Sequence, residues 1–294
     1  MNESMSSSPK YVVITPVRDE EEHLEETIRS VINQTIRPTE WIIVNDGSTD
    51  LTPDIIDKYA EQNQWIRGVH RTNRGFRKSG GGVVEAFYDG FERLSCHDWD
   101  FVVKLDGDLS FEPDYFERIL GVFSKEPKLG IAGGTLYYFS RGELQKERNP
   151  QFHVRGATKV YRRECWRQIG GLWPAAGWDT IDETGASMRG WTTMSIPDIQ
   201  VLHHRPTGGA DGMWYDSVKH GRIWYAVGYH PLFVLASCLY RAVHKPYLVR
   251  SVGGLYGYLH AYLTRVPRVN DSALIKFVRR EQMKRLLGQE TIWR

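Results

Sequence analysis

Residues 100–111, DFVVKLDGDLSF, decide the fold of this chain and the place of its site. The run FVVKL at 101–105 has the length and apolar character of a strand that is buried on both faces. Asp106 and Asp108 follow it, with one glycine between them. A turn accounts for one of these acids, whereas a bound divalent cation accounts for both, because hard cations prefer carboxylate oxygens.

The chain before this stretch alternates between strand and helix patterns. Three further β-branched runs are predicted as strands, at residues 11–15, 40–47 and 65–71. Amphipathic helical patterns lie between the strands, at residues 20–34, 50–62 and 81–94. Such alternation predicts parallel strands joined by right-handed crossovers. The sequence therefore predicts a Rossmann-like α/β layer, with ligands bound at the carboxyl ends of its strands.

The pattern becomes mixed after Asp108. Helices are predicted at residues 113–125 and 182–191, strands at 129–140 and 192–206, a polar loop at 141–151, and a strand followed by a glycine-capped helix within 153–171. We divide the chain into a disordered lead (1–10), an α/β domain (11–210, with halves at 11–108 and 109–210) and a mostly helical C-terminal extension (211–294).

The composition is that of an ordinary globular protein, with 41% hydrophobic and 25% charged residues among 294. The three cysteines are far apart, so they form neither a metal-binding spacing nor a disulfide framework. This pattern favours a reducing compartment. The first ten residues are polar and carry no apolar core of a signal peptide.

Positive charge gathers in the C-terminal part. Residues 219–294 contain 13 Lys and Arg against 3 Asp and Glu, a balance of +10, while the rest of the chain balances at −8. A basic segment of this kind indicates an anionic partner, either nucleic acid or an anionic membrane leaflet. No basic-aromatic RNA-binding motif is evident, so we do not expect nucleic acid.

Two apolar stretches in this segment, 223–240 and 251–263, are too short or too interrupted to span a bilayer. We expect them to form helices at a membrane surface. A soluble core, a contact with a second copy of the chain, or a re-entrant insertion are the alternatives.

Polar residues follow three of the predicted strands, as TPVRDEE (15–21), NDGSTD (45–50) and DGD (106–108). In an open α/β sheet such ends meet in one crevice, where carboxylates can bind a nucleobase, a ribose or a divalent ion. Neither a G-x-G-x-x-G after a strand nor a P-loop occurs. The diphosphate of a bound nucleotide therefore needs another partner, and a metal held by Asp106 and Asp108 supplies it.

Four segments in this order resemble one known family: residues 12–35, 41–52, 73–75 (NRG) and 102–108. They are similar to the inverting GT-A glycosyltransferases of family two, and the resemblance covers about residues 11–206. It implies a mixed GT-A sheet with helices on both faces. It also implies a UDP- or GDP-sugar donor, Mn²⁺ or Mg²⁺, and a carboxylate base.

The resemblance also implies roles for individual residues. Nucleotide contacts fall on Pro16, Arg18, Glu20, Asp46, Arg71, Arg74 and Asp106. Metal ligands fall on Asp106, Asp108 and one histidine of LHHRP. We expect only one of His203 and His204 to reach the site, because neighbouring side chains of a strand point to opposite faces, and we favour His204. Arg18 and Asp19 depart from the aromatic residue and Asn that the family more often has, which leaves the identity of the donor's nucleobase open.

The expected catalytic base, which takes the proton of the acceptor hydroxyl, lies in GWDTIDETGASMRGW, residues 177–191. Matching the family's later arginine to Arg189 favours Glu183, with Asp182 as a close competitor. The alternative is that both are helix N-terminal acids favoured by the helix dipole. Further contacts with the sugar or acceptor are expected from Arg155, Gly156, Trp178, Asp179 and His203.

The acidic pair favours a saccharide hydroxyl as acceptor, since a hydroxyl must lose a proton whereas a phosphate is already anionic. We expect a lipid-linked or cell-surface glycan precursor, and a location at the cytoplasmic face of a membrane. Two alternatives remain: a polyprenyl-phosphate glycosyl synthase of the same fold, and a non-catalytic nucleotide or nucleic-acid binding protein.

Overall fold

The computed structural model describes residues 9–76, 81–140, 142–147, 149–205, 212–243 and 248–293. The chain divides into two compact units. Unit 1 consists of Met1–Gly171 and Gly190–Arg205, and unit 2 of Leu172–Arg189 and Pro206–Arg294. The two units are described in turn.

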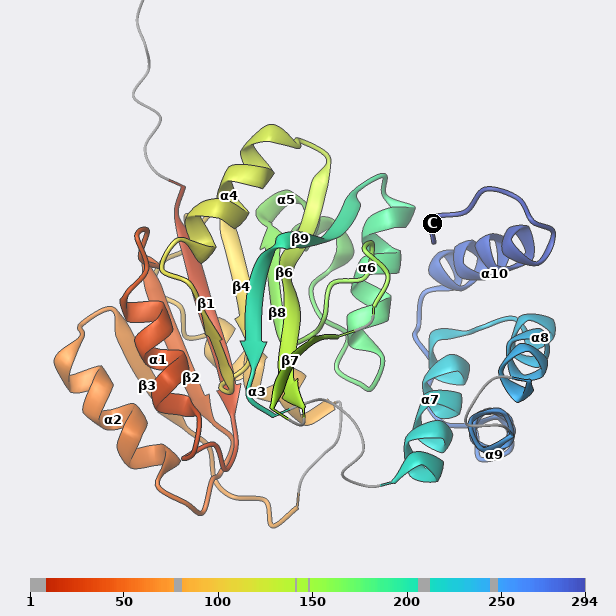
Figure 1. Cartoon of the computed structure of the whole chain (residues 1–294), viewed down its shortest axis with the longest axis horizontal. Coiled ribbons are helices and arrows are strands. Elements are labelled where there is room, and N and C mark those ends of the chain that lie inside the picture. Colours follow the sequence, from red (N-terminus) through yellow and green to blue (C-terminus); the bar gives the residue numbers. More distant parts are fainter. Residues whose placement is uncertain are drawn as a thin grey trace, which may run out of the picture. The chain divides into compact units, whose positions relative to one another are not determined.

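The first half of unit 1 is the predicted alternation of strands and helices (Figure 1). Its elements are β1 (Tyr11–Val17), α1 (Leu24–Ile32), β2 (Glu40–Asn45), α2 (Thr52–Gln62), β3 (Ile66–His70), α3 (Gly81–Phe91) and β4 (Phe101–Leu105). The strands pair in the order β3-β2-β1-β4, and all three pairings are parallel. The expected parallel layer is confirmed.

The second half of unit 1 makes the sheet mixed, as predicted. Its elements are β5 (Leu109–Phe111), α4 (Tyr115–Lys125), β6 (Leu129–Ser140), β7 (Glu143–Lys146), β8 (Thr158–Arg162), α5 (Arg163–Ile169) and β9 (Thr192–His203). The order continues as β4-β8-β6-β9-β5. Only the β6–β9 pairing among these is parallel. Strand β7, which pairs with β6, lies in the stretch predicted as a polar loop.

The core of unit 1 explains why its strands read as continuous apolar runs. Val12, Val13 and Ile14 are all fully buried, although neighbouring strand side chains point to opposite faces. Helices must therefore cover both faces of this part of the sheet.

Unit 2 is helical in its described residues. It comprises α6 (Trp178–Met188), α7 (Met213–Val227), α8 (Pro231–Ala242), α9 (Val249–Leu263) and α10 (Ser272–Leu286). Helix α6 begins four residues before the predicted start at 182. Gly177 precedes it with a φ of +93°, and Trp178 and Ile181 bury their side chains, so the apolar period of the helix begins earlier than the acidic pair suggested.

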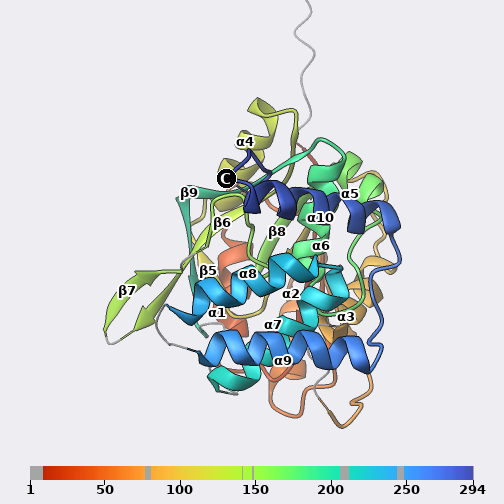
Figure 2. The same ribbon diagram turned by 90° about the vertical axis from the view of Figure 1, so that its right-hand side faces the viewer.

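Helices α7 and α9 pack closely through glycines. A Cβ on Gly221 would lie 2.0 Å from the carbonyl oxygen of Gly254, and a Cβ on Gly257 would lie 2.1 Å from that of Val218. Such contacts require glycine, because backbone atoms of a packed helix cannot move aside. Figure 2 shows α8 and α9 running side by side on one surface of the unit.

None of the helices that the structure describes is long and apolar enough to cross a membrane.

Candidate functional site

Polar residues of unit 1 meet at the edge formed by the carboxyl ends of the parallel strands. In the β1–β2 register, Val17 is opposite Asn45, so the residues that follow, Arg18 and Asp46, come directly after two strand ends at the same level of the sheet. Strand β4 lies on the other side of β1 and leads into Asp106. The three motifs that followed strands in the sequence therefore share one edge.

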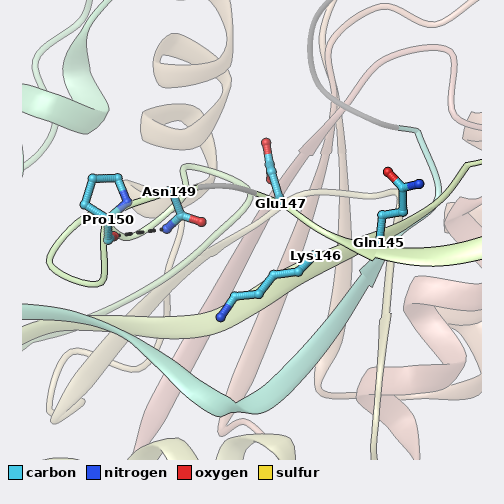
Figure 3. Close-up of a pocket in the computed structure, with 5 residues that line it drawn as sticks. All are labelled: Gln145, Lys146, Glu147, Asn149 and Pro150. Carbon is cyan, nitrogen blue, oxygen red and sulfur yellow. Dashed lines mark hydrogen bonds between the residues drawn. The ribbon is translucent and has the colours of Figure 1, made fainter.

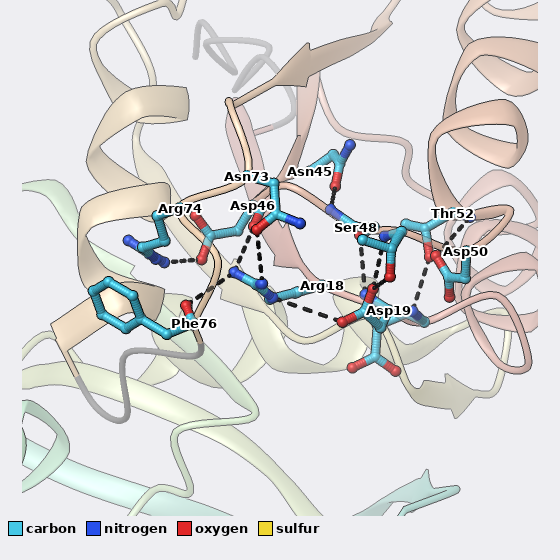
Figure 4. A network of polar contacts seen from close by, with 12 residues as sticks. Arg18, Asp19, Asn45, Asp46, Ser48, Asp50, Thr52, Asn73, Arg74 and Phe76 are labelled. Carbon is cyan, nitrogen blue, oxygen red and sulfur yellow. Dashed lines mark hydrogen bonds and ion pairs between the residues drawn. The ribbon is translucent and has the colours of Figure 1, made fainter.

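Asp46 is the centre of a network of charged groups (Figure 4). Its carboxylate accepts hydrogen bonds from Arg71, at 2.5 Å, and from Arg74. Arg71 also pairs with Asp89 at 2.6 Å, and Arg74 with Glu85 at 3.3 Å. Both arginines are thus held beside Asp46 by a second acid.

Arg18 joins the loops around this network. Its guanidinium donates to the carbonyl oxygens of Asp46 and Phe76, both at 3.2 Å, and to Oδ1 of Asn73 at 3.1 Å. Arg18 contacts the backbone of the loop at Asp46, whereas the Asp46 carboxylate is bound by Arg71 and Arg74. In the structure Arg18 therefore braces two loops.

Asp19 lies between Arg18 and Glu20, in the segment expected to line the nucleobase and ribose, and its backbone conformation explains the residue type. Its φ is +53°, a region in which Asn and Asp are the residues most readily accommodated after glycine. Its Oδ1 accepts from the backbone N–H of Thr49 at 2.9 Å, and its own N–H donates to Oγ of Ser48 at 2.9 Å. Asp19 fastens the loop after β1 to the loop after β2.

Asp106 stands beside a buried lysine. Lys104 donates to Oδ1 of Asp106 and, at 2.7 Å, to the carbonyl oxygen of Gly156. Burial and the negative charge of Asp108 raise the pKa of Asp106, against the opposing effect of Lys104. Gly156, which was expected to contact the sugar or acceptor, accepts this hydrogen bond and so positions Lys104.

Asp108 is held by two cationic groups. Its Oδ2 lies 3.4 Å from Nε2 of His203 and 3.5 Å from Nε of Arg205. Burial acts to raise the pKa of Asp108, but the hydrogen bond and charge of His203 outweigh it, and the pKa is lowered. Burial likewise opposes the proton on His203, but Asp108 outweighs burial and raises the pKa of His203. Arg205 also donates to Oε1 of Glu20.

His204 has a different environment from His203. Its Nε2 lies 2.9 Å from Oγ of Ser110 and 2.9 Å from Oε2 of Glu26, and its ring stacks on His23 with centroids 5.2 Å apart. The two histidines diverge because they are neighbours at the end of a strand. The structure brings His203, and not the favoured His204, to Asp108.

The donors at this edge fit a hard divalent cation. Asp106 and Asp108 offer carboxylate oxygens at one strand end, which is the chemistry that Mg²⁺ and Mn²⁺ prefer when phosphates supply further ligands. Within the described residues, no group of three or more His, Cys, Asp or Glu side chains is already assembled around a metal position.

A pocket of about 820 Å³ lies in unit 1 along β7 and the segment after it (Figure 3). Its lining residues are Gln145, Lys146, Glu147, Asn149 and Pro150. Glu147 pairs with Arg155 at 2.5 Å, and its charge contributes to the raised pKa of His203. Arg155 is therefore held beside this pocket by Glu147. No motif in the sequence pointed to Glu147.

The predicted acidic pair belongs to α6 in unit 2. Asp182 and Glu183 are buried, with 2% and 6% of their surface exposed, and the N–H of Glu183 donates to Oδ1 of Asp182 at 2.6 Å. Asp179 is the acid in the first turn of α6, directly after the buried Trp178. The helix dipole therefore accounts for Asp179 but not for the two acids one turn later, because its effect is confined to the first turn.

Comparison with known proteins agrees with this architecture. The model of the family described as Glycosyl transferase family 2 matches residues 12–177, more than half of the chain. Glycosyltransferase GlyA of Streptococcus pneumoniae is 31% identical over 155 residues, which cover 52% of this chain and 20% of that protein. Two other relatives, from Bacillus subtilis and Haemophilus influenzae, are 31% and 28% identical over 46% and 45% of this chain. The chain spans 37% and 38% of their lengths.

Solved structures share the fold at low identity. The mannosyltransferase PcManGT from Pyrobaculum calidifontis, in complex with GDP-Man and Mn²⁺, has a TM-score of 0.57 at 16% identity, over 97% of this chain and 77% of that one. TarS 1-349 from S. aureus, in complex with UDP-GlcNAc, has a TM-score of 0.56 at 14% identity, over 95% and 92%. The predicted GT-A fold is confirmed, and this chain belongs to glycosyl transferase family 2.

Proposed function

We propose that the chain is a metal-dependent inverting glycosyltransferase that moves a sugar from a nucleotide-diphosphate sugar to a saccharide hydroxyl. The observation that carries this proposal is that Asp106, Asp108 and the Asp46 network follow strands that end at the same edge of the sheet. Acidic metal ligands and a charged nucleotide pocket at one edge are the two requirements for activating a sugar diphosphate.

Asp46 and its two arginines form the proposed nucleotide pocket. A carboxylate can accept the ring N–H of uracil or of guanine, so Asp46 suits either base. Arg71 and Arg74 would contact the nucleobase or the phosphates, and their ion pairs with Asp89 and Glu85 restrain them. Pro16 and Glu20, at the end of β1 and in the loop after it, border the ribose in this proposal.

Asp106 and Asp108 would hold Mn²⁺ or Mg²⁺, which neutralises the charge that develops on the departing nucleoside diphosphate. In this proposal His203, and not the predicted His204, would be the third protein ligand, because its Nε2 lies 3.4 Å from Oδ2 of Asp108. Arg205, at 3.5 Å from the same carboxylate, is a second cation for the phosphates.

We assign the base to Glu183, with Asp182 as the alternative. A hydroxyl nucleophile must give up its proton as it attacks, and a carboxylate on the side opposite the leaving group can accept that proton. Attack by the hydroxyl from this side inverts the configuration of the anomeric carbon. Two buried acids that the helix dipole does not explain support this role. Trp178 and Asp179 are proposed acceptor contacts from the same helix, and Arg155 a sugar contact beside the Glu147 pocket.

The acceptor is proposed to be lipid-linked or part of a cell-surface glycan precursor, reached at the cytoplasmic face of a membrane. The basic C-terminal segment supports this location.

The test is a donor screen that measures nucleotide release from UDP- and GDP-sugars, with Mn²⁺, with Mg²⁺ and with EDTA. Saccharides and lipid extract serve as acceptors, and the anomeric configuration of the product is read by NMR. We expect release that needs a metal and an acceptor, with inverted configuration. Retained configuration, or metal-independent release, would contradict the mechanism. Absence of turnover with all donors would favour a non-catalytic nucleotide-binding protein.

The same screen separates the acceptor classes. Asp182→Asn and Glu183→Gln are compared with saccharide and with polyprenyl phosphate. Activity that survives both substitutions and requires polyprenyl phosphate would identify a polyprenyl-phosphate glycosyl synthase instead, because an anionic phosphate needs no base.

A further inference from the structure

We propose that the outer surface of α8 and α9 docks flat on an anionic lipid bilayer. This inference names the surface behind the membrane location proposed above. It rests on unit 2 alone, and lipid binding can be measured without sugar transfer.

Helix α9 has two opposite faces. Its inner face carries Gly253, Gly254 and Gly257, which pack against α7. Its outer face carries large apolar residues at a spacing of three and four, and all are exposed: Val249, Val252, Tyr256, Leu259 and Leu263. At 100° per residue, these five lie in one stripe along the helix.

Helix α8 repeats this arrangement. Val234 and Cys238 are buried on its inner side. Leu232, Leu235 and Leu239 form an exposed stripe that continues to Val243, just beyond the helix. Helices α8 and α9 lie side by side (Figure 2). We infer that their two exposed stripes act together as one apolar surface, which we term the α8–α9 face. Leu239 is 64% exposed and Leu263 78%, so described residues of the chain leave this face largely uncovered.

The charges around the α8–α9 face favour an anionic partner. Residues 217–270 contain no Asp or Glu, although the chain has 36. The same stretch contains seven Lys and Arg: Lys219, Arg222, Arg241, Lys245, Arg250, Arg265 and Arg268. Arg250 and Arg265 are exposed, one near each end of α9.

A second copy of the chain is a poor partner for such a surface. A symmetric dimer would place the same patch against itself and bring like charges together. An anionic bilayer attracts these charges and accepts the apolar stripes, while Tyr240, Tyr256 and Tyr262 suit the interface between head groups and acyl chains. With no described helix able to span, the chain would lie on the surface of the bilayer.

The experiment is flotation of the full chain with two kinds of vesicle, phosphatidylcholine alone and phosphatidylcholine with roughly 30% phosphatidylglycerol. We expect binding to the anionic vesicles and at least about tenfold weaker binding to the neutral ones. The double variant Leu239→Glu/Leu259→Glu should lose at least about tenfold in binding, because it removes two apolar contacts and adds repulsion. Arg250→Glu/Arg265→Glu should reduce binding to anionic vesicles only.

Leu287→Glu is the matched control. Leu287 is 69% exposed in the same unit but follows α10 and belongs to neither apolar stripe, so this variant should bind as the wild type does. Circular dichroism confirms that each variant is folded. Equal binding by wild type and the double variant, or no binding by the wild type, would overturn the proposal. So would a wild-type dimer without lipid that the double variant converts to monomer, since a second copy would then cover the face. Loss of vesicle binding with unchanged nucleotide release in solution separates this inference from the catalytic proposal.

Discussion

His203 and Asp108 form an ion pair, with Nε2 of His203 3.4 Å from Oδ2 of Asp108. The pair joins the end of β9 to the turn after β4, two points about 95 residues apart in the sequence. The next residue, His204, is bonded instead to Ser110 and Glu26. This divergence of two neighbouring histidines gives the first prediction.

His203→Ala should lower kcat/KM by at least about a hundredfold, because it removes a proposed metal or phosphate ligand. His204→Ala should lower it by less than about threefold. The measurement is metal-dependent nucleotide release across a range of Mn²⁺ concentration. A larger loss for His204 than for His203 would restore the assignment made from the sequence.

Asp108→Ala should abolish transfer, by more than about a thousandfold, while the protein remains folded. Folding is checked by circular dichroism and thermal unfolding. Asp98→Ala, at an exposed acid that pairs with Lys10, is the control and should keep full activity. A fully active Asp108→Ala protein would remove the basis of the proposed metal site.

Glu183→Gln should reduce kcat by about a hundredfold to ten-thousandfold and leave KM for the donor nearly unchanged, as expected when a general base is lost. Asp182→Asn should have a smaller effect if Glu183 is the base. The reverse order would assign the role to Asp182. Asp179→Asn, in the first turn of α6, should change kcat by less than either.

Glu20 should make stability depend on pH. Burial, and next the charge of Asp108, raise its pKa from 4.5 to about 7, against Arg205. Its Oε2 is buried without a hydrogen-bond partner among the described residues. The native state therefore holds this proton more tightly than the unfolded chain does. The stabilisation is complete below pH 4.5 and is lost as the pH rises through about 7.

Glu20→Gln removes this dependence because glutamine does not titrate. Between about pH 5 and pH 8 the wild type should lose on the order of 2 kcal/mol of unfolding free energy relative to the variant. Urea denaturation in EDTA at both pH values measures the difference. Parallel pH profiles for the two proteins would show that the pKa of Glu20 is not raised.

The glycine contacts of α7 and α9 predict a stability effect that is independent of catalysis. Gly257→Ala should destabilise unit 2 by about 1–3 kcal/mol, because its Cβ would lie 2.1 Å from the carbonyl oxygen of Val218. Gly121→Ala in α4 is the control. Its Cβ meets nothing within 4 Å, so alanine should stabilise by about 0.5–1 kcal/mol. Thermal unfolding of both variants gives the two signs, and equal effects would argue against close α7–α9 packing.

Local patterns sufficed to predict the parallel half of the sheet. The runs that became β1, β2, β3 and β4 are apolar because they are buried on both faces, and that burial leaves a continuous signal in the sequence. The same patterns placed Asp46, Asp106 and Asp108 at one edge, since carboxyl ends of neighbouring parallel strands coincide. The family resemblance followed from these motifs together, and the family-model match confirmed it.

Helix boundaries and weakly patterned strands were less predictable. Helix α6 begins at Trp178 because of a left-handed Gly177 and a buried tryptophan, not because of its acidic pair. Strand β7 is exposed along its whole length and forms by pairing with β6, so its composition is that of a loop.

The sequence by itself determined the order of strands and helices in the parallel half of the sheet, the family, and the acids that end the strands, because each depends on neighbours along the chain. The choice of His203 over His204, the pairing of Glu20 with Arg205, and the Glu147–Arg155 pair were decided only by the tertiary structure. Glu20 and Arg205 are 185 residues apart. The side chains that meet across such a separation depend on sheet register and strand direction, and local sequence patterns determine neither of these.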